Sequence, residues 1–162
     1  MKQAYTEIDS PVGRLLLAGE QGCLRALLFA EGPKRATPQE DWVADAVPFR
    51  PVIDQLNAYF AGELREFAVN LDPEGTTFQL RVWRELSRIP YGETISYGQL
   101  ATRIGNPKAS RAVGLANGSN PISIIVPCHR VIGSNGKLTG YGGGLPIKEK
   151  LLGLERRQLS FL

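Results

Sequence analysis

The chain has 162 residues, of which 43% are hydrophobic, enough for one sizeable core or for two small domains packed together. Its longest uncharged stretch, residues 113–128, is broken by asparagine, glycine and proline, and residues 1–10 lack the apolar run of a signal peptide, so we expect a cytoplasmic protein without a membrane span. Two cysteines and one histidine exclude a disulfide framework and a cysteine/histidine zinc site, and no other metal is expected.

The net charge of +3 hides a division between the two halves of the chain. Residues 1–76 carry 7 Lys and Arg against 12 Asp and Glu, a net charge of −5, whereas residues 77–162 carry 12 against 4, a net charge of +8. A solvated surface with a chance bias is the simpler explanation of a single charge run. A contrast of this size favours a polyanionic partner, of which a phosphate backbone is the commonest.

The first half predicts an α/β module. Three short apolar runs within residues 4–29 alternate with turn signals, which is typical of a three-stranded antiparallel sheet, and Cys23 is expected there as a small buried side chain. Residues 31–50 are rich in proline and charge and predict a loop, whereas residues 52–60 have helical spacing. The segment NLDPEGTT, residues 70–77, coincides with the change of charge sign and predicts a domain boundary.

The second domain, residues 77–162, is expected to be mostly helical. Thr77 is the expected N-cap of a helix that runs up to Pro90, and Ser96 with Gln99 has the spacing of a capping box. Gly105 is expected to end that helix, and the next one is expected to open at residues 106–107. Its apolar positions fall at i, i+3, i+4 and i+7, namely Ala109, Ala112, Val113 and Ala116. Two short helices in this relation predict a helix-turn-helix, so the whole fold class is α+β, with a winged-helix-like second module.

Most side chains on the face of the second helix opposite its apolar stripe are unusually small. Arg111 is flanked there by Ser110, Gly114, Leu115 and Gly118. Because each glycine weakens a helix by about 1 kcal/mol, such a row indicates that something bulky approaches the backbone. Tight packing on the other domain is one explanation, and duplex DNA fits the surrounding charge better.

A cysteine beside the only histidine marks the candidate reactive site. The run NPISIIVP, residues 120–127, predicts a strand that leads to Cys128 and His129. Neighbouring side chains on an extended chain point to opposite faces, so contact between this pair needs a bridging water or a curved turn. A cysteine nucleophile requires a base, and that base requires a third group to orient it.

The last helix, within residues 145–162, offers the third group. Glu155 lies in the middle of an arc of leucines on its helical wheel, and a buried carboxylate is costly unless it is paired. His129 is the natural partner. A solvent-facing Glu155, or one paired with Lys148, is the alternative.

Several ordered motifs carry a resemblance to a known family. PCHRVIG (residues 127–133), with RAVGLANGSNP upstream and GYGGG and KEKLLGLE downstream, closely resembles the O6-alkylguanine-DNA alkyltransferases. The resemblance covers nearly all of residues 77–162 and extends more weakly over residues 1–76. It implies single-turnover DNA repair, in which O6-alkylguanine, and O4-alkylthymine as a further substrate, loses its alkyl group to the protein's own cysteine.

The resemblance implies roles for individual residues. Cys128 corresponds to the nucleophile, His129 and Glu155 to the relay that activates it, and Asn120 to the brace of the active-site turn. The residues that correspond to those around the flipped base are Tyr97, Tyr141, Val131, Gly142 and Gly143. The residues that correspond to DNA contacts are Arg111, Ser110, Ala112, Gly114 and Tyr97.

The resemblance also implies the partner. The family binds double-stranded DNA through the minor groove, flips the damaged base and uses no cofactor, and we expect a monomer that can bind DNA cooperatively. Gly142 departs from relatives with a hydroxyl side chain there, which affects the expected alkyl size. The alternatives are a non-catalytic protein that recognises alkylated bases, a Cys-His-acid hydrolase and a helix-turn-helix transcription factor.

Overall fold

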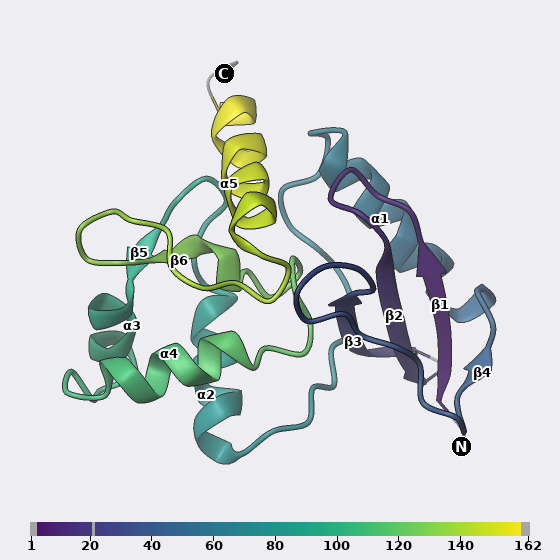
Figure 1. Ribbon diagram of the computed structural model, residues 1–162, viewed down its shortest axis with the longest axis horizontal. Coiled ribbons are helices and arrows are strands. Elements are labelled where there is room, and N and C mark those ends of the chain that lie inside the picture. The colour runs from purple at the N-terminus through teal and green to yellow at the C-terminus, as the bar shows by residue number, and fades with distance from the viewer. Residues whose placement is uncertain (1–2, 21, 160–162) are drawn as a thin grey trace.

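The computed structural model describes residues 3–20 and 22–159, which form two lobes that lie side by side (Figure 1). The amino-terminal lobe, within residues 3–76, is a sheet with one helix against it, and the carboxy-terminal lobe, residues 77–159, is mostly helical. The predicted α+β class is therefore confirmed. Within the described ranges, no helix combines the length and hydropathy needed to cross a membrane.

The amino-terminal sheet has the strand order β3-β2-β1-β4. Strands β1 (Ala4–Ile8), β2 (Leu15–Glu20) and β3 (Cys23–Phe29) form the predicted antiparallel meander. The prediction of three strands was wrong by one, because β4 (Val43–Ala44) pairs in parallel with β1. A strand of two residues is too short to produce a periodic signal, and its segment was expected to be a loop.

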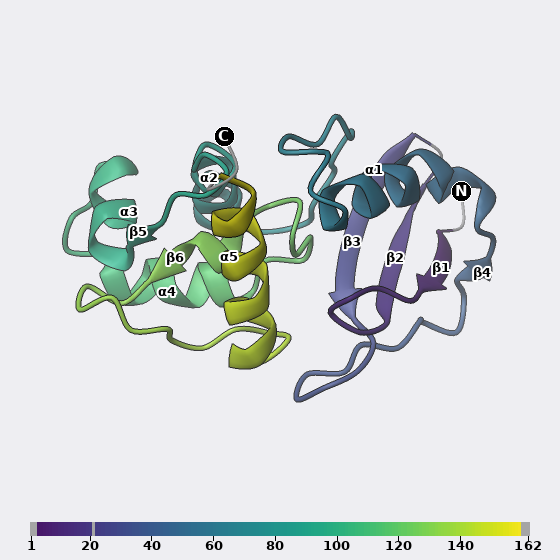
Figure 2. The same ribbon diagram turned by 90° about the horizontal axis from the view of Figure 1, so that it is seen from above.

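The core of this lobe lies between the central strand and helix α1. The apolar residues of β2 are fully buried, and α1 (Arg50–Phe60), preceded by the 3₁₀ turn η1 (Val47–Phe49), crosses one face of the sheet (Figure 2). Cys23 was expected to be buried, but it is exposed at the first position of β3. Cys23 directly follows the turn residue Gly22 and begins a strand at the edge of the sheet, where its side chain is left uncovered.

The carboxy-terminal lobe begins with α2 (Thr77–Leu86). Its N-cap is Thr76 rather than the expected Thr77, and Thr76 forms a reciprocal capping box with Gln79. The helix also ends before Pro90 is reached, because the amides of Arg88 and Ile89 donate to carbonyls only three residues back, which tightens the chain into turns. The indole of Trp83 donates to the Ala116 carbonyl over 2.7 Å and ties α2 to the helix that contains Ala116.

The predicted helix-turn-helix consists of α3 (Tyr97–Arg103) and α4 (Ser110–Gly118). Ser96 and Gln99 form the expected capping box, and Gly105 ends α3 with a φ of +82°. The second helix starts later than expected, because the Ala109 amide donates to the Asn106 carbonyl and closes a separate turn first.

Short parallel strands and the last helix complete this lobe. The elements are β5 (Ile95–Ser96), the 3₁₀ turn η2 (Cys128–Arg130), β6 (Val131–Ile132) and α5 (Leu145–Leu159). In the described residues β5 and β6 pair with each other in parallel. This pairing does not test the winged-helix detail, which stays a prediction. The expected strand over residues 120–127 is reduced to one bridge between Ile122 and Leu27 of β3, followed by a turn.

Candidate active site at Cys128

The backbone before Cys128 is a braced turn that joins the two lobes. Leu27 of β3 donates its amide to the Pro121 carbonyl and accepts from the Ser123 amide, each over 2.9 Å. Asn120 accepts from the Ile122 amide (3.0 Å) and donates to the Val126 carbonyl (2.9 Å). Asn120 therefore closes the turn from inside, as the bracing role requires.

One residue of this turn adopts a strained conformation. Ile124 has a φ of +72°, in the left-handed region that β-branched residues rarely enter, and its side chain is buried. Such strain persists only where the surroundings determine the backbone, which here are the Asn120 bonds and the packing against β3. The turn delivers Cys128 onto η2 with 5% of its surface exposed.

His129, on the 3₁₀ turn η2 directly after Cys128, contacts Glu155 of α5. The distance from His129 Nε2 to Glu155 Oε2 is 2.7 Å, and both residues are fully buried. The predicted burial of Glu155 in its leucine arc is thus observed. Within the described residues His129 Nδ1 is buried without a hydrogen-bond partner. If Nε2 carries the proton shared with Glu155, Nδ1 presents its lone pair and can accept a proton.

Arg130 completes the carboxylate site. Its Nε donates to Glu155 Oε1 (2.8 Å) and its second guanidinium nitrogen donates to Oε2 (3.1 Å), while the remaining nitrogen donates to the Ile89 carbonyl (2.7 Å). Such a fork fixes the plane of the carboxylate. Arg130 was not predicted as a site residue, although its place directly after the Cys-His pair was the available signal.

Electrostatics keep the carboxylate ionised and the imidazole neutral. Burial raises the pKa of Glu155, but hydrogen bonds and charges from His129 and Arg130 outweigh burial, and the net pKa lies well below the ordinary value. Burial lowers the pKa of His129, and the opposing effect of Glu155 does not fully restore it. A neutral histidine beside an ionised carboxylate is a competent general base.

The thiol itself is protonated at rest. Burial raises the pKa of Cys128 above its ordinary value, and hydrogen bonding to Asn120 and the charge of Lys148 offset this only in part. A buried thiol is inert until a base removes its proton. The environment therefore combines an unreactive resting cysteine with a nearby base.

Lys148 is buried on the same face of α5 as Glu155, seven residues earlier. Its Nζ donates to the carbonyls of Val131 (2.7 Å) and Thr139 (3.0 Å), so the alternative of a Lys148–Glu155 pair is not what the structure contains. The two carbonyls belong to β6 and to the loop that follows it. Lys148 thus anchors this loop to the last helix.

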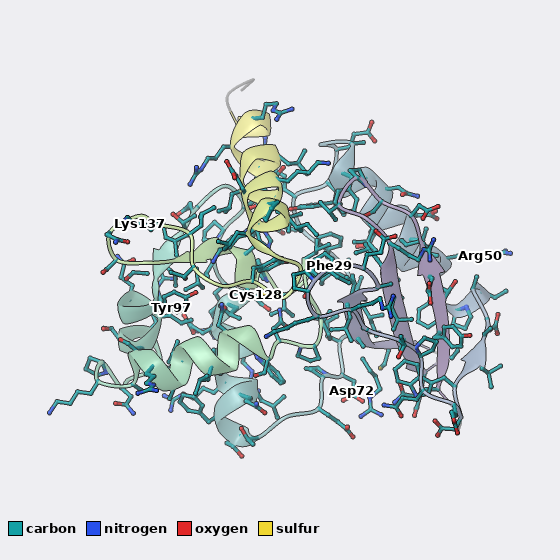
Figure 3. All side chains as sticks on the ribbon, viewed as in Figure 1. Phe29, Arg50, Asp72, Tyr97, Cys128 and Lys137 are labelled. Atoms are coloured by element: carbon teal, nitrogen blue, oxygen red, sulfur yellow. The ribbon has the colours of Figure 1, made fainter. Side chains whose placement is uncertain are left out.

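The loop of residues 133–144 and the end of β3 enclose a hollow of about 100 Å³ at Cys128. Tyr141 and Gly142 line it from the loop, and Phe29 and Lys34 line it from the amino-terminal lobe. Phe29 and Tyr141 lie edge to face with ring centroids 5.6 Å apart. Figure 3 shows Phe29 close to Cys128, on the side of the amino-terminal lobe. The contribution of Phe29 and Lys34 was not predicted, because no local pattern links residues so distant in sequence.

The glycines of this loop differ in the room that their surroundings leave for a side chain. A Cβ at Gly143 would lie 2.9 Å from the Phe29 ring, so this position has no room for a side chain. A Cβ at Gly142 would meet nothing within 4 Å. Gly142 therefore borders open space at the hollow, whereas Gly143 is required by packing.

A wider hollow of about 570 Å³ adjoins the first along α4. Arg111 and Ser110 line it, together with Tyr97, whose hydroxyl bonds the Thr139 hydroxyl at 2.7 Å. Gly114 is packed against the Tyr97 ring rather than open to solvent, because a Cβ at this position would lie 3.7 Å from that ring.

Two residues of α4 lie differently from the predicted helical wheel. Ala112 was assigned to the inward stripe but is exposed, whereas Asn117 is buried and donates to the Cys128 carbonyl (3.4 Å). The burial of Asn117 was not predicted, because the inward stripe was defined by apolar residues and asparagine is polar. Leu115 is 72% exposed, close along the helix to Arg111, which is also exposed. The exposed face therefore presents arginine, leucine and small residues together.

Metal ligands are not gathered at this site or at any other part of the described chain. Residues 3–20 and 22–159 contain no group of three or more His, Cys, Asp or Glu side chains able to hold an ion. The groups that the structure does bring together here are the His129 imidazole and the Glu155 carboxylate, and Cys128 directly precedes His129 on η2.

Two family models match the chain in succession. The DNA binding domain of 6-O-methylguanine DNA methyltransferase matches residues 77–157, and the ribonuclease-like domain of 6-O-methylguanine DNA methyltransferase matches residues 4–73. Both matches together span nearly all of the sequence.

Individual proteins are similar over the same length. The methylated-DNA–protein-cysteine methyltransferase of Methanosarcina acetivorans is 59% identical over 151 residues, which cover 93% of this chain and 97% of that protein. The protein of the same name from Mycobacterium tuberculosis strain H37Rv is 59% identical over 152 residues, covering 94% and 92%. The crystal structure of Mycobacterium tuberculosis OGT in complex with DNA has a TM-score of 0.90 and 58% identity, covering 96% of this chain and 94% of that chain.

Proposed function

Because the chain belongs to the 6-O-methylguanine DNA methyltransferase family, we propose that Cys128 is the cysteine that accepts the alkyl group. The protein repairs DNA directly, by moving an alkyl group from alkylated guanine to its own cysteine, and each molecule acts once. The observation that carries the assignment is the free, buried thiol of Cys128 on the turn that also presents His129 to Glu155. Cys23, by contrast, is exposed.

The proposed transfer accounts for each proton that moves and for each bond that forms or breaks. His129 takes the thiol proton, directly or through a water, and Glu155 stabilises the imidazolium that forms. The thiolate sulfur then attacks the alkyl carbon, the new S–C bond forms and the bond from carbon to O6 breaks. The departing guanine receives a proton from the Tyr141 hydroxyl, and the imidazolium returns the proton to that tyrosine. The thioether has no route back, which accounts for one transfer per molecule.

Burial of Tyr141 supports its place in this scheme. Burial raises the pKa of the Tyr141 hydroxyl well above its ordinary value, with the nearby Cys128 adding to the effect. A phenol that resists ionisation stays protonated until a developing negative charge accepts its proton. Tyr141, Gly142 and Gly143 would cover the flipped base, and the backbone of Cys128 and Val131 would receive its edge.

We further propose that α4 enters the minor groove. Arg111 and Ala112 are exposed on this helix, Ser110 is half-buried and Gly114 lies beside Tyr97, and the small residues among them allow close approach to a duplex. Arg111 would fill the gap left by the flipped nucleotide, and Tyr97 would turn the adjoining phosphate outward. A protein acting in this way binds as a monomer, and neighbouring molecules bind cooperatively.

The remaining expectations are proposals of the same kind. Two domains divided between residues 76 and 77 are supported by the change of charge sign there, and by family models that meet at this place. The free thiols of Cys23 and Cys128 support a cytoplasmic location, where thiols stay reduced. A hydrolase, a transcription factor and a non-catalytic recognition protein are not supported, because the relatives that cover nearly the whole chain carry the methyltransferase name.

The test is the intact mass of the protein after incubation with duplex DNA that contains O6-methylguanine. We expect a gain of one methyl group, located on the peptide with Cys128, and the same experiment with O4-methylthymine tests the second substrate. Cys23→Ser is the matched control and should gain the methyl group as the wild type does, whereas Cys128→Ser should gain none. Methylation of Cys23, or repeated turnover, would contradict the assignment.

A further inference from the structure

Tyr59 brings the amino-terminal lobe into the carboxylate site. It lies at the end of α1 that faces the carboxy-terminal lobe (Figure 2), and its side chain is fully buried. Its hydroxyl donates to Glu155 Oε2 over 2.6 Å, a contact between residues 96 positions apart. The carboxylate that binds His129 is therefore also bound from the other lobe.

Three donors share one oxygen. Glu155 Oε2 accepts from Tyr59 (2.6 Å), from His129 Nε2 (2.7 Å) and from Arg130 (3.1 Å), while Oε1 accepts from Arg130 and, at 3.4 Å, from the Gly92 amide. The positive end of the Tyr59 hydroxyl dipole thus lies against the same oxygen that faces the imidazole. It offsets part of the negative potential that the imidazole experiences.

The hydroxyl can act only as a donor. Burial, followed by the charge of Glu155 and the hydrogen bond to it, raises the pKa of Tyr59 far above its ordinary value. The proton therefore stays on Tyr59 at every pH at which the protein functions. Tyr59 cannot serve as a base or relay the thiol proton itself.

The direction of the hydroxyl is set by aromatic packing from both lobes. The Tyr59 ring contacts Phe60 and Phe67 of its own lobe, with centroids 5.3 Å and 5.4 Å away, and Tyr91 of the other lobe, at 6.2 Å. Two χ angles define a tyrosine, so rings packed on several sides leave the hydroxyl little freedom. The bond to Glu155 is therefore built into the contact between the lobes.

From these contacts we propose that Tyr59 is a positioning residue that, through Glu155, sets the proton affinity of His129 and so links the packing of the amino-terminal lobe to activation of Cys128. The proposal rests on the function proposed above for Cys128 and His129. Loss of the hydroxyl leaves the charge of Glu155 less compensated, which stabilises the imidazolium. Loss of the carboxylate charge has the opposite effect.

The experiment uses the fact that His129 is the only histidine of the chain. NMR titration of the imidazole in protein without a histidine tag follows His129 without further assignment. We expect Tyr59→Phe to raise the pKa of His129 by about half a unit or more, and Glu155→Gln to lower it. In the double variant the effect of Tyr59→Phe should disappear, because the charge on which it acts is gone.

Tyr91→Phe is the matched control. It removes a hydroxyl from the same aromatic cluster, and that hydroxyl has no hydrogen-bond partner among the described residues. It should leave the titration of His129 unchanged. Thermal unfolding of each variant establishes that the compared proteins are folded.

A second readout follows the thiol. The rate at which iodoacetamide modifies Cys128, measured on its peptide across pH, should move to lower pH in Tyr59→Phe and to higher pH in Glu155→Gln, while the profile of Cys23 stays constant. Iodoacetamide needs no DNA, so this result stands apart from the methyl-transfer test of the proposed function. An unchanged or upward-shifted Cys128 profile, with an unchanged His129 titration, would overturn the role of Tyr59.

Discussion

A buried, neutral histidine makes this protein sensitive to moderate acid. Burial holds the pKa of His129 below its ordinary value of about 6.5. Below that pH the unfolded chain binds a proton that the folded chain does not bind. The unfolded state then gains stability relative to the folded state, so the free energy of unfolding falls as the pH falls.

We therefore predict that the stability of the protein decreases between about pH 7 and pH 5, by up to about 1.4 kcal/mol per pH unit from this one group. Urea denaturation at a series of pH values measures the slope. His129→Gln keeps a donor for Glu155 but cannot titrate, so its slope should be smaller by about one proton. Equal slopes in the two proteins would show that another group causes the acid sensitivity.

At the scale of single elements, α4 has a packed inner face and an exposed arginine, and these two features do not depend on each other. Its inner face is held by Val113, Ala116 and the Trp83 indole, whereas Arg111 is exposed and lines the hollow that adjoins Cys128. An exposed side chain can be changed without disturbing the core. The contribution to base flipping that we propose for Arg111 can therefore be measured separately from the stability of the helix.

Arg111→Ala should slow repair of O6-methylguanine in duplex DNA by about tenfold or more, since flipping costs a few kcal/mol and the variant no longer fills the gap. Transfer from free O6-benzylguanine should be almost unchanged, because a free base needs no flipping. Arg50→Ala, which removes an equal charge from the far edge of the amino-terminal lobe (Figure 3), is the control for charge alone. An equal loss with both substrates would contradict the proposed role.

At the scale of the whole molecule, charge is divided between the lobes. Residues 77–162 carry a net charge of +8 and residues 1–76 a net charge of −5, although the total is only +3. The basic lobe contains both α4 and Cys128. Binding to DNA should therefore follow the charge of one lobe rather than the total.

We predict a strong dependence of duplex affinity on salt. Neutralising about three phosphates would weaken binding by about 40-fold for a fourfold rise in monovalent salt. Lys108→Ala, in the exposed turn before α4, should reduce the slope of log affinity against log salt by about one, whereas Arg50→Ala should leave it unchanged. Fluorescence anisotropy with undamaged duplex measures both. A slope near zero in the wild type would refute binding by the basic lobe.

Local patterns alone determined most elements and the candidate reactive residues. The meander, the Ser96–Gln99 capping box, the end of α3 at Gly105 and the burial of Glu155 all depend on residues within a few positions of one another. Helical and strand periods, caps and turns are encoded at this range, so a sequence reveals them. The boundary errors at Thr77 and at the start of α4 are of one or a few residues.

Only the tertiary structure decided which residues complete the carboxylate site and which positions of an element are covered. Tyr59 reaches Glu155 across 96 positions, Arg130 divides its guanidinium between Glu155 and Ile89, and Phe29 and Lys34 line the hollow at Cys128 from the other lobe. Cys23 and Ala112 are exposed although their local patterns indicated burial. The physical reason is that burial and long-range hydrogen bonds depend on how separate elements pack, and periodicity within one element carries no information about the surface that will cover it.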